Sequence, residues 1–221
     1  MSSASPRGAL VVVEGLDRSG KSSQCQILVD HLNQSGSKAQ YVKFPDRSTP
    51  TGKMINSYLT GSAQQDDHSI HLLFSANRWE AIQSILQMLE FGMNIIIDRY
   101  SFSGAVYSAA KDNPNLGLDW AWACEVGLPK PDLVLFLDLS SEEAARRGGY
   151  GEERYETQQM QSRVRALFQD LFKRLPNVNL KQINAGCSID DVATEIRTTF
   201  GRFVEQAKLE RPPEKLQTLS A

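Results

Sequence analysis

The stretch Val11–Ser22, which reads VVVEGLDRSGKS, decides the fold of this chain. The three consecutive valines at its start are typical of a strand that is buried on both faces of a parallel sheet. Gly15 and Gly20 then allow the backbone conformations that a tight turn requires. The pattern G-x-x-x-x-G-K-S in Gly15–Ser22 predicts a phosphate-binding loop that leads into a helix.

The residues of this loop suit a nucleotide phosphate. Where the helix begins, free backbone N–H groups and the positive end of the helix dipole converge on a site for an anion. Lys21 adds charge for the β- and γ-phosphates, with phosphate and solvent as its only expected contacts, and the Ser22 hydroxyl can ligate Mg²⁺. A chance match is the alternative, but the strand before the loop and the amphipathic segment after it favour phosphate binding. The expected nucleotide contacts are Gly15, Leu16, Asp17, Arg18, Ser19, Gly20, Lys21, Ser22 and Ser23.

Length and composition fit one α/β domain. The chain has 221 residues, of which 41% are hydrophobic, so that it can bury a substantial core. Its net charge of −2 gives no electrostatic argument for a nucleic-acid or membrane partner. Cys25, Cys124 and Cys187 are far apart in the sequence and predict neither a zinc site nor a disulfide framework. No signal peptide or membrane span is evident, so we expect a cytosolic or nuclear protein.

Strand-like and helix-like segments alternate along the chain. This pattern predicts an α/β fold in which a five-stranded parallel sheet is flanked by helices on both faces. The expected strands are Ala9–Val13, Ala39–Phe44, Asn94–Asp98, Leu133–Asp138 and Val178–Ile183. The expected helices are Gly20–Ser35, Asp67–Glu90, Phe102–Ala110, Asp119–Val126, Tyr155–Arg174 and Ile189–Lys208. Together they form a single domain over residues 9–208.

Three stretches resist regular structure. Residues 1–8 are small and polar, and we expect them to be disordered. Residues 209–221 include two consecutive prolines, which cannot continue a helix, and we expect a flexible tail. Arg146–Tyr155, RRGGYGEERY, combines glycines with charges and predicts a short glycine-rich lid over about residues 144–156. A solvated linker is the alternative for this segment.

Informative polar residues follow the expected strands, at the edge where parallel sheets bind ligands. FPDRS begins at Phe44, and DRYSFS begins at Asp98. Asp98 is placed to organise Mg²⁺, while Arg47 and Arg99 can clamp a second phosphate that does not belong to ATP. For Arg99, a salt bridge to a neighbouring carboxylate is the alternative.

The segment Asp67–Glu90 carries further candidates. Phe74 and Arg78 are four residues apart and share a helix face, so that the ring can stack on a base while the guanidinium donates to its carbonyl edge. His68 and His71 also share a face, but the sequence shows no third metal ligand. We expect the two histidines to be helix-start and packing residues.

Taken together, these motifs resemble those of the thymidylate kinases of the eukaryotic type, which belong to the nucleoside monophosphate kinase group of P-loop proteins. The matching stretches are EGLDRSGKS, FPDRS, HLLFSANRWE, IIDRYSFSG, GLPKPDLVLFLDL and GYGEERYE, with a weaker match in NAGCSID. The resemblance implies a P-loop NTPase fold and transfer of a phosphoryl group from ATP to dTMP. It further implies Mg²⁺ as the cofactor and a homodimer.

The resemblance also assigns roles to individual residues. Phe74 would stack on thymine, Arg78 would donate to its O4 atom, and Arg47 and Arg99 would hold the dTMP phosphate. Tyr155 would crowd a ribose 2′-hydroxyl and so favour deoxyribose. Phe44, Ser103, Tyr107 and Gln161 would complete the dTMP site, and Arg147, Ala185, Gly186 and Cys187 would surround the adenine of ATP.

The implied catalytic residues are Asp17, Arg18, Lys21 and Asp98, and the implied metal ligands are Ser22 and Asp98. Asp17 stands among phosphate-binding residues, where a carboxylate would repel the ligand unless it accepts from the sugar 3′-hydroxyl or holds an arginine. Arg18 would stabilise the transferred phosphoryl group, and Arg154 in the lid is the competing candidate for that charge.

Three other functions are open to a P-loop chain. A deoxynucleoside kinase acts on a hydroxyl and needs a carboxylate base, whereas Arg47 favours a phosphorylated acceptor. A GTPase would need a guanine-reading N-K-x-D motif after a late strand, which the sequence lacks. An inactive nucleotide-binding scaffold is disfavoured because Arg18, Lys21, Ser22 and Asp98 are all in place.

Overall fold

The computed structural model describes residues 7–147, 153–210 and 217–220. Its centre is a five-stranded sheet with the order β2-β3-β1-β4-β5, in which every paired strand is parallel to its neighbour. The strands are β1 (Leu10–Gly15), β2 (Ala39–Lys43), β3 (Asn94–Asp98), β4 (Leu133–Asp138) and β5 (Leu180–Asn184). The predicted α/β fold is confirmed.

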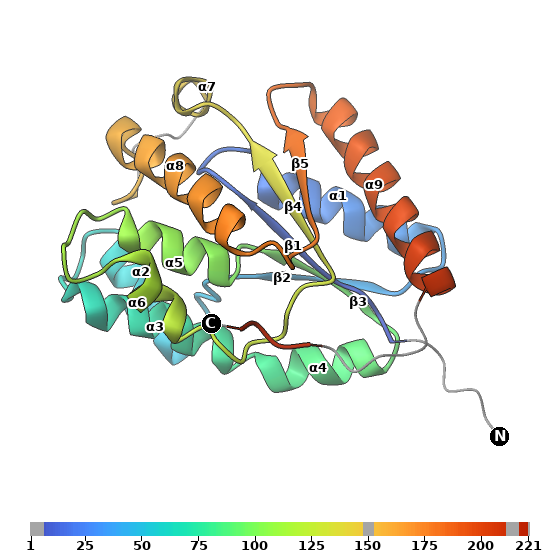
Figure 1. Ribbon diagram of the computed structural model, residues 1–221, viewed down its shortest axis with the longest axis horizontal. Helices are drawn as coiled ribbons and strands as arrows, with labels where there is room; N and C mark the ends of the chain where they lie inside the picture. The colour runs from blue at the N-terminus through green and yellow to red at the C-terminus, as the bar shows by residue number, and fades with distance from the viewer. Residues whose placement is uncertain (1–6, 148–152, 211–216, 221) are drawn as a thin grey trace.

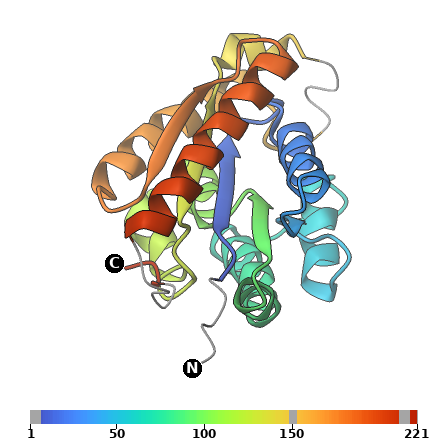
Figure 2. The same cartoon turned by 90° about the vertical axis from the view of Figure 1, so that its right-hand side faces the viewer.

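Helices cover both faces of this sheet (Figures 1 and 2). They are α1 (Lys21–Gln34), α2 (Pro50–Leu59), α3 (Asp67–Trp79), α4 (Ile82–Glu90), α5 (Ser101–Ala109), α6 (Leu118–Ala123), α7 (Ser141–Ala145), α8 (Gln158–Arg174) and α9 (Ile189–Glu210). Helices α1 and α9 pack together on one face, while α4, α5 and α8 lie on the other. Among the described residues, no helix has both the length and the apolar character to cross a membrane.

Alternate side chains of each strand belong to different cores. Val11 and Val13 pack with residues of α1 and α9, whereas Leu10 and Val12 pack with residues of α4, α5 and α8. Both sets are buried, as a strand at the middle of a parallel sheet requires. The valine run that predicted this strand therefore supplies both cores at once.

The helix expected over Asp67–Glu90 is broken into α3 and α4. The break falls at Glu80, whose carboxylate accepts from Thr51 Oγ1 at 2.7 Å and from Asn77 Nδ2 at 2.8 Å. At Ala81 the backbone N–H bonds to the carbonyl three residues back, which tightens the last turn of α3. The chain thus changes direction where side chains tie it to α2.

Two helices were not predicted, although each carries a recognisable start. Thr49 caps α2 by accepting from Gly52 N, and Pro50 stands at the first helical position. Ser140 and Glu143 form a reciprocal capping box at α7. Both start signals are local, but the expected helices do not include either segment.

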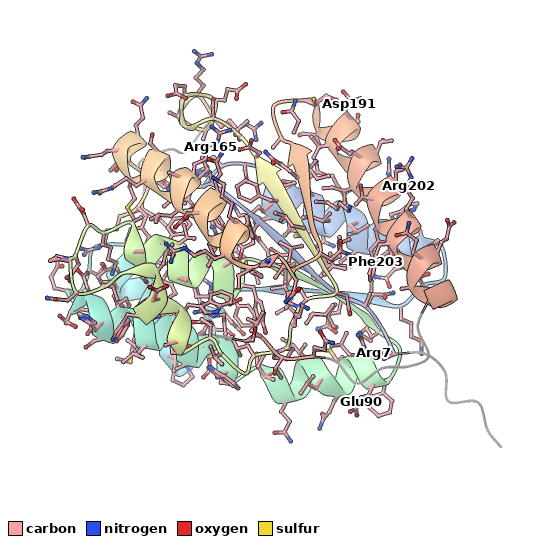
Figure 3. All side chains as sticks on the ribbon, in the orientation of Figure 1. Arg7, Glu90, Arg165, Asp191, Arg202 and Phe203 are labelled. Atoms are coloured by element: carbon pink, nitrogen blue, oxygen red, sulfur yellow. The ribbon has the colours of Figure 1, made fainter. Side chains whose placement is uncertain are left out.

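The expected disorder of residues 1–8 is wrong for Arg7 and Gly8. Arg7 forms two 2.7 Å hydrogen bonds with the carboxylate of Asp132, at the amino ends of the strands (Figure 3). The N–H of Gly8 donates to Leu89 O at 2.8 Å. Residues 1–6 lie outside the described part of the chain.

The expected flexible tail is wrong for residues 217–220. The backbone of this segment pairs with residues 127–130 in an isolated antiparallel bridge, and the side chain of Leu219 is only 4% exposed. Trp122 Nε1 also donates to Ser220 O at 2.9 Å. Residues 209 and 210 belong to α9, while 211–216 and 221 lie outside the described residues.

Candidate functional site

A cavity of about 760 Å³ lies at the carboxyl ends of the strands. It extends from residues of α3, past the phosphate-binding loop, to the segment before α9. The predicted site residues that line it are Asp17, Arg18, Ser19, Gly20, Lys21, Ser22, Ser23, Phe44, Arg47, Phe74, Arg78, Asp98, Arg99, Ser103, Tyr107, Arg147, Tyr155, Ala185 and Cys187. Gly15, Leu16, Gln161 and Gly186 are not among its lining residues.

The backbone of the phosphate-binding loop needs its glycines. Gly15 has φ of 148°, and a Cβ atom there would lie 2.6 Å from Leu137 O. Gly20 has φ of 93° and forms the N-cap of α1. Arg18 also adopts a positive φ of 63°, which is uncommon for a residue with a side chain. The loop therefore holds a strained arginine three residues before the start of α1.

Lys21 is more enclosed than the sequence predicted. Its side chain is 5% exposed, and Nζ donates to Leu16 O at 2.5 Å and to Gly15 O at 3.1 Å. The prediction that Lys21 contacts only phosphate and solvent is thus wrong. Burial, reinforced by the charge of Arg99, lowers the pKa of Lys21 to about 8, so that the ammonium is still the main form at neutral pH.

The predicted metal ligands meet at the first turn of α1. Ser22 Oγ donates to Asp98 Oδ2 at 2.5 Å, and Tyr41 OH donates to the same oxygen at 2.9 Å. Asp98 Oδ1 is buried and has no hydrogen-bond partner among the described residues. A hydroxyl beside a carboxylate with an unused oxygen is a donor set that fits Mg²⁺.

Asp17 is held from three sides at the centre of the cavity. Its carboxylate forms an ion pair with Arg99 and accepts from Tyr107 OH at 3.1 Å and from Gln161 Nε2 at 2.7 Å. Burial acts to raise the pKa of Asp17, but the charges of Arg99 and Lys21 and the donated hydrogen bonds outweigh burial and hold that pKa below its ordinary value. Asp17 therefore remains a carboxylate that positions Arg99.

Gln161 lies behind the cavity wall rather than in it. Its side chain is fully buried, with Oε1 accepting from Asp17 N at 2.9 Å and Nε2 donating to Tyr155 O at 2.9 Å. Gln161 thereby joins the phosphate-binding loop to the segment that carries Tyr155. The ring of Tyr155 packs against those of Tyr58 and Tyr107, with centroids 6.2 and 5.8 Å away.

At the α3 end of the cavity, Arg78 is buried in an ion pair with Glu125. Arg78 Nε donates to Glu125 Oε2 at 2.8 Å, and Nη2 donates to Oε1. Gly104 makes room for this guanidinium, because a Cβ atom there would lie 2.4 Å from Nη2. Phe74 lines the same cavity one helical turn away.

Two lining arginines pair with glutamates from residues 153–156. Arg47 Nη2 lies 2.6 Å from Glu153 Oε1, and Arg18 Nε lies 3.0 Å from Glu156 Oε1. Arg154 turns elsewhere: its Nε donates to Tyr58 O at 3.1 Å, and its guanidinium lies 4.1 Å from the centre of the Tyr58 ring. Residues 148–152 of the predicted lid lie outside the described residues.

The far end of the cavity is tied together by Arg147. Nη1 donates to Arg18 O at 2.9 Å, and Nη2 donates to Ala185 O at 2.6 Å.

Asp138, the last residue of β4, pairs with an arginine of α8. Its carboxylate accepts two 2.8 Å hydrogen bonds from Arg165 (Figure 3). Asp138 therefore joins the sheet to α8 and does not line the cavity.

Comparison with known proteins identifies the family. Residues 13–196 match the family model described as thymidylate kinase. The chain is 52% identical to the thymidylate kinase of Schizosaccharomyces pombe, over 86% of this chain and 90% of the relative. It is 47% identical to that of Homo sapiens, over 88% of this chain and 90% of the relative.

The chain belongs to the thymidylate kinase family. A solved thymidylate kinase from Candida albicans superposes with a TM-score of 0.83 at 40% identity, covering 98% of this chain and all of that one. Enzymes of this family use ATP to phosphorylate dTMP to dTDP, a step of dTTP synthesis. The predicted family, fold and enzymatic function are confirmed.

Sequence reasoning missed several residues of this thymidylate kinase site. Glu14, in the valine-rich β1, is fully buried and accepts from Tyr100 N, Ser103 N and Ser103 Oγ. Glu125 similarly interrupts an apolar stretch of the sequence. A carboxylate within an apolar run was the available signal for both. Lys43, whose Nζ lies 3.3 Å from Ser22 Oγ, carried no such signal.

Proposed function

We propose that the chain transfers a phosphoryl group from ATP to dTMP with the help of Mg²⁺. We further propose that it binds both nucleotides in one continuous cavity. The observation that carries the proposal is the shared cavity itself. It joins the phosphate-binding loop to two further arginines, Arg47 and Arg99, and to the Phe74–Arg78 pair. A site for one nucleotide would not need a second cluster of phosphate-binding charges.

The ATP half is built from the phosphate-binding loop and the segment before α9. Lys21 neutralises the β- and γ-phosphates, and the N–H groups at the start of α1 bind their oxygens. Arg147 bridges this loop to Ala185, so that it can lie against a purine. Cys187 lines the same end of the cavity.

Ser22 and Asp98 are the residues that would hold Mg²⁺, and the orphaned Asp98 Oδ1 supports this assignment. The ion supplies charge neutralisation between the β- and γ-phosphates when bound. Tyr41 and Lys43 flank the carboxylate and orient it toward α1. Members of the family use ATP with a divalent metal, and the identity of that metal as Mg²⁺ is part of this proposal.

The dTMP half places base, sugar and phosphate against different residues. Phe74 stacks on thymine, and Arg78, held by Glu125, donates to O4. Tyr155 limits the space beside the sugar. Arg99, held by Asp17, binds the dTMP phosphate together with Arg47.

The reaction needs positioning more than covalent chemistry. The acceptor phosphate is already an anion, so the protein has to align it with the γ-phosphate, neutralise charge and exclude water. Arg18 is the residue that can reach the transferred group, because it belongs to the loop and lines the cavity. No residue is required as a general base.

We also propose a homodimer and a cytosolic or nuclear location. Met54 on α2, Leu72 and Trp79 on α3, and Trp120 on α6 are large apolar side chains with 39–48% of their surface exposed. Burying such side chains against a second copy would remove apolar surface from water. Analytical ultracentrifugation tests the dimer, and a monomer at micromolar concentration would contradict it.

The function is tested by a coupled ADP-release assay with dTMP, dUMP, dCMP, dAMP and dGMP, and with thymidine as an acceptor that lacks the phosphate. Cytosine presents an amino group where thymine presents O4, so Arg78 would face it donor to donor. An unpaired buried donor costs about 1–3 kcal/mol, or roughly tenfold to a hundredfold in kcat/KM. The Candida albicans enzyme has broad substrate specificity, which makes the full panel informative. Equal turnover of dCMP and dTMP would contradict the role of Arg78, and turnover of thymidine would favour a deoxynucleoside kinase.

A further inference from the structure

A cluster of three metal-binding side chains lies directly behind the base end of the cavity. We propose that His71, Cys124 and Glu125 bind a divalent cation of the Zn²⁺ class. The candidate donor atoms all lie within 4.8 Å of one another. His71 and Glu125 are fully buried, while Cys124 is partly exposed.

The spacing of the donor atoms is close to what a tetrahedral ion requires. Donors at Zn–N and Zn–O distances near 2.1 Å and a Zn–S distance near 2.3 Å are separated from each other by roughly 3.6 Å. Cys124 Sγ lies 3.6 Å from Glu125 Oε1 and 3.0 Å from His71 Nε2. The sulfur–nitrogen pair has to open, and a water molecule can complete the shell.

A partner for the other nitrogen of the imidazole favours this use of His71. Nδ1 lies 2.7 Å from Ser108 Oγ. When Nδ1 donates its proton to that hydroxyl, the lone pair of Nε2 faces Cys124 Sγ. Metal-binding histidines are commonly held in this way, with the second ring nitrogen fixed by a hydrogen bond.

The chemistry of the donors selects the class of cation. One thiol, one imidazole and one carboxylate suit Zn²⁺ or Co²⁺, whereas Mg²⁺ prefers oxygen ligands only. Binding replaces the thiol proton of Cys124, which leaves to solvent, and the resulting thiolate balances one charge of the ion. The Glu125 carboxylate is then shared between the ion and Arg78. The site is therefore chemically distinct from the one at Ser22 and Asp98.

This position links the cation to recognition of the base. Glu125 Oε1 also accepts from Arg78 Nη2, and Ser108 itself lines the cavity. A cation on Oε1 draws the carboxylate from Arg78 and adds positive charge beside the guanidinium. Zn²⁺ should therefore weaken dTMP binding and leave ATP binding unchanged, a consequence that depends on the proposed role of Arg78.

The site is tested with the full-length protein and Co²⁺ as the optical probe. We expect stoichiometric binding with a thiolate-to-cobalt absorption band, release of one proton, and loss of the band when Zn²⁺ is added. Cys124→Ser should abolish the band, His71→Gln should weaken binding, and Cys187→Ser, which changes an exposed thiol elsewhere, should keep the band. A wild-type protein without the band, or a band that survives Cys124→Ser, overturns the site.

The link to the base is measured separately, by kinetics in a Zn²⁺ buffer with excess Mg²⁺. We expect the KM for dTMP to rise about tenfold or more, as for the loss of one buried hydrogen bond, and the Cys124→Ser variant to be insensitive. An unchanged KM in the presence of an occupied site overturns the link. If dTMP is not a substrate at all, the proposed function fails, while the Co²⁺ titration still decides the metal site.

Discussion

Several charged side chains of the nucleotide-binding cavity are buried. Lys21 shows the consequence most directly, because its ammonium lies inside the loop and donates to two backbone carbonyls. Burying a cation disfavours its charged form, and the pKa of Lys21 falls to about 8. The phosphate-binding charge is therefore lost at a lower pH than that of an ordinary lysine.

The first prediction concerns pH. We expect kcat/KM for ATP to fall as pH rises through about 8, because Lys21 then loses its proton. Since the folded pKa lies below the unfolded value of 10.5, the unfolded chain binds more protons between these two values. The contribution of Lys21 to the free energy of unfolding thus rises with pH in that window, opposite in direction to ATP binding.

Steady-state kinetics and urea denaturation across this range measure both quantities. Lys21→Arg is the control, because a guanidinium stays charged throughout and any activity it retains should not decline near pH 8. A wild-type profile that is flat through pH 8 would contradict the lowered pKa.

The second prediction concerns Gly104, whose missing side chain leaves space for Arg78. In Gly104→Ala the new Cβ atom would lie 2.4 Å from Arg78 Nη2, so the guanidinium has to move. We expect the KM for dTMP to rise about tenfold or more, with the KM for ATP unchanged. Gly117→Ala is the matched control, because no atom of the described residues lies within 4 Å of its Cβ position and its φ is −78°. Equal KM values in both variants would show that Arg78 does not read the base.

Among the elements, two segments compete to supply the catalytic arginine: the phosphate-binding loop and residues 153–156 of the predicted lid. Arg18 lines the cavity from the loop, whereas Arg154 is bound to the end of α2 through Tyr58 O and the Tyr58 ring. This geometry favours Arg18. Glu153 and Glu156, which flank Arg154, instead pair with Arg47 and Arg18. The lid segment therefore contributes acids to the cavity.

The third prediction follows from this arrangement. Arg18→Gly should lower kcat on the order of 10³-fold, because an arginine at the transferred phosphoryl group contributes about that much. The Arg18→Gly variant should keep the fold, because the φ of 63° at residue 18 suits glycine. Arg154→Ala should have a milder effect on kcat. Comparing kcat for the two variants decides the matter, and a larger loss in Arg154→Ala would assign the catalytic charge to the lid.

At the scale of the whole molecule, residues distant in sequence complete one core. Leu219, near the C-terminus, is buried in the same cluster as residues of β1, α5 and α8. Its backbone N–H donates to Leu128 O, and its carbonyl accepts from Gly127 N. Residues 217–220 therefore pack as part of the same domain as the phosphate-binding loop.

The fourth prediction tests this contribution. Leu219→Ala should lower the free energy of unfolding by about 2–4 kcal/mol, the usual cost of truncating a buried leucine. Gln217→Ala, at an exposed position two residues away, should change it by less than about 0.5 kcal/mol. Urea denaturation of the two variants provides the comparison. Similar stabilities would mean that the segment is not docked in solution.

Features of this protein that depend on neighbouring residues could be predicted from the amino-acid sequence. The valine run, the glycines of Gly15–Ser22 and the alternation of strands and helices predict the parallel sheet and the phosphate site. Phe74 and Arg78 could be paired because helical periodicity places them on one face. In each case the physical constraint acts within a few residues of the chain.

Contacts between residues that are distant in the sequence became visible only in the folded chain. Arg78 acquires Glu125 as its partner, Asp17 acquires Arg99 and Gln161, and the tail acquires residues 127–130. His71 showed no third ligand in the sequence, yet packing brings Cys124 and Glu125 to it. Contacts across 40 or more residues depend on how helices pack on a sheet, and local periodicity carries no information about that packing.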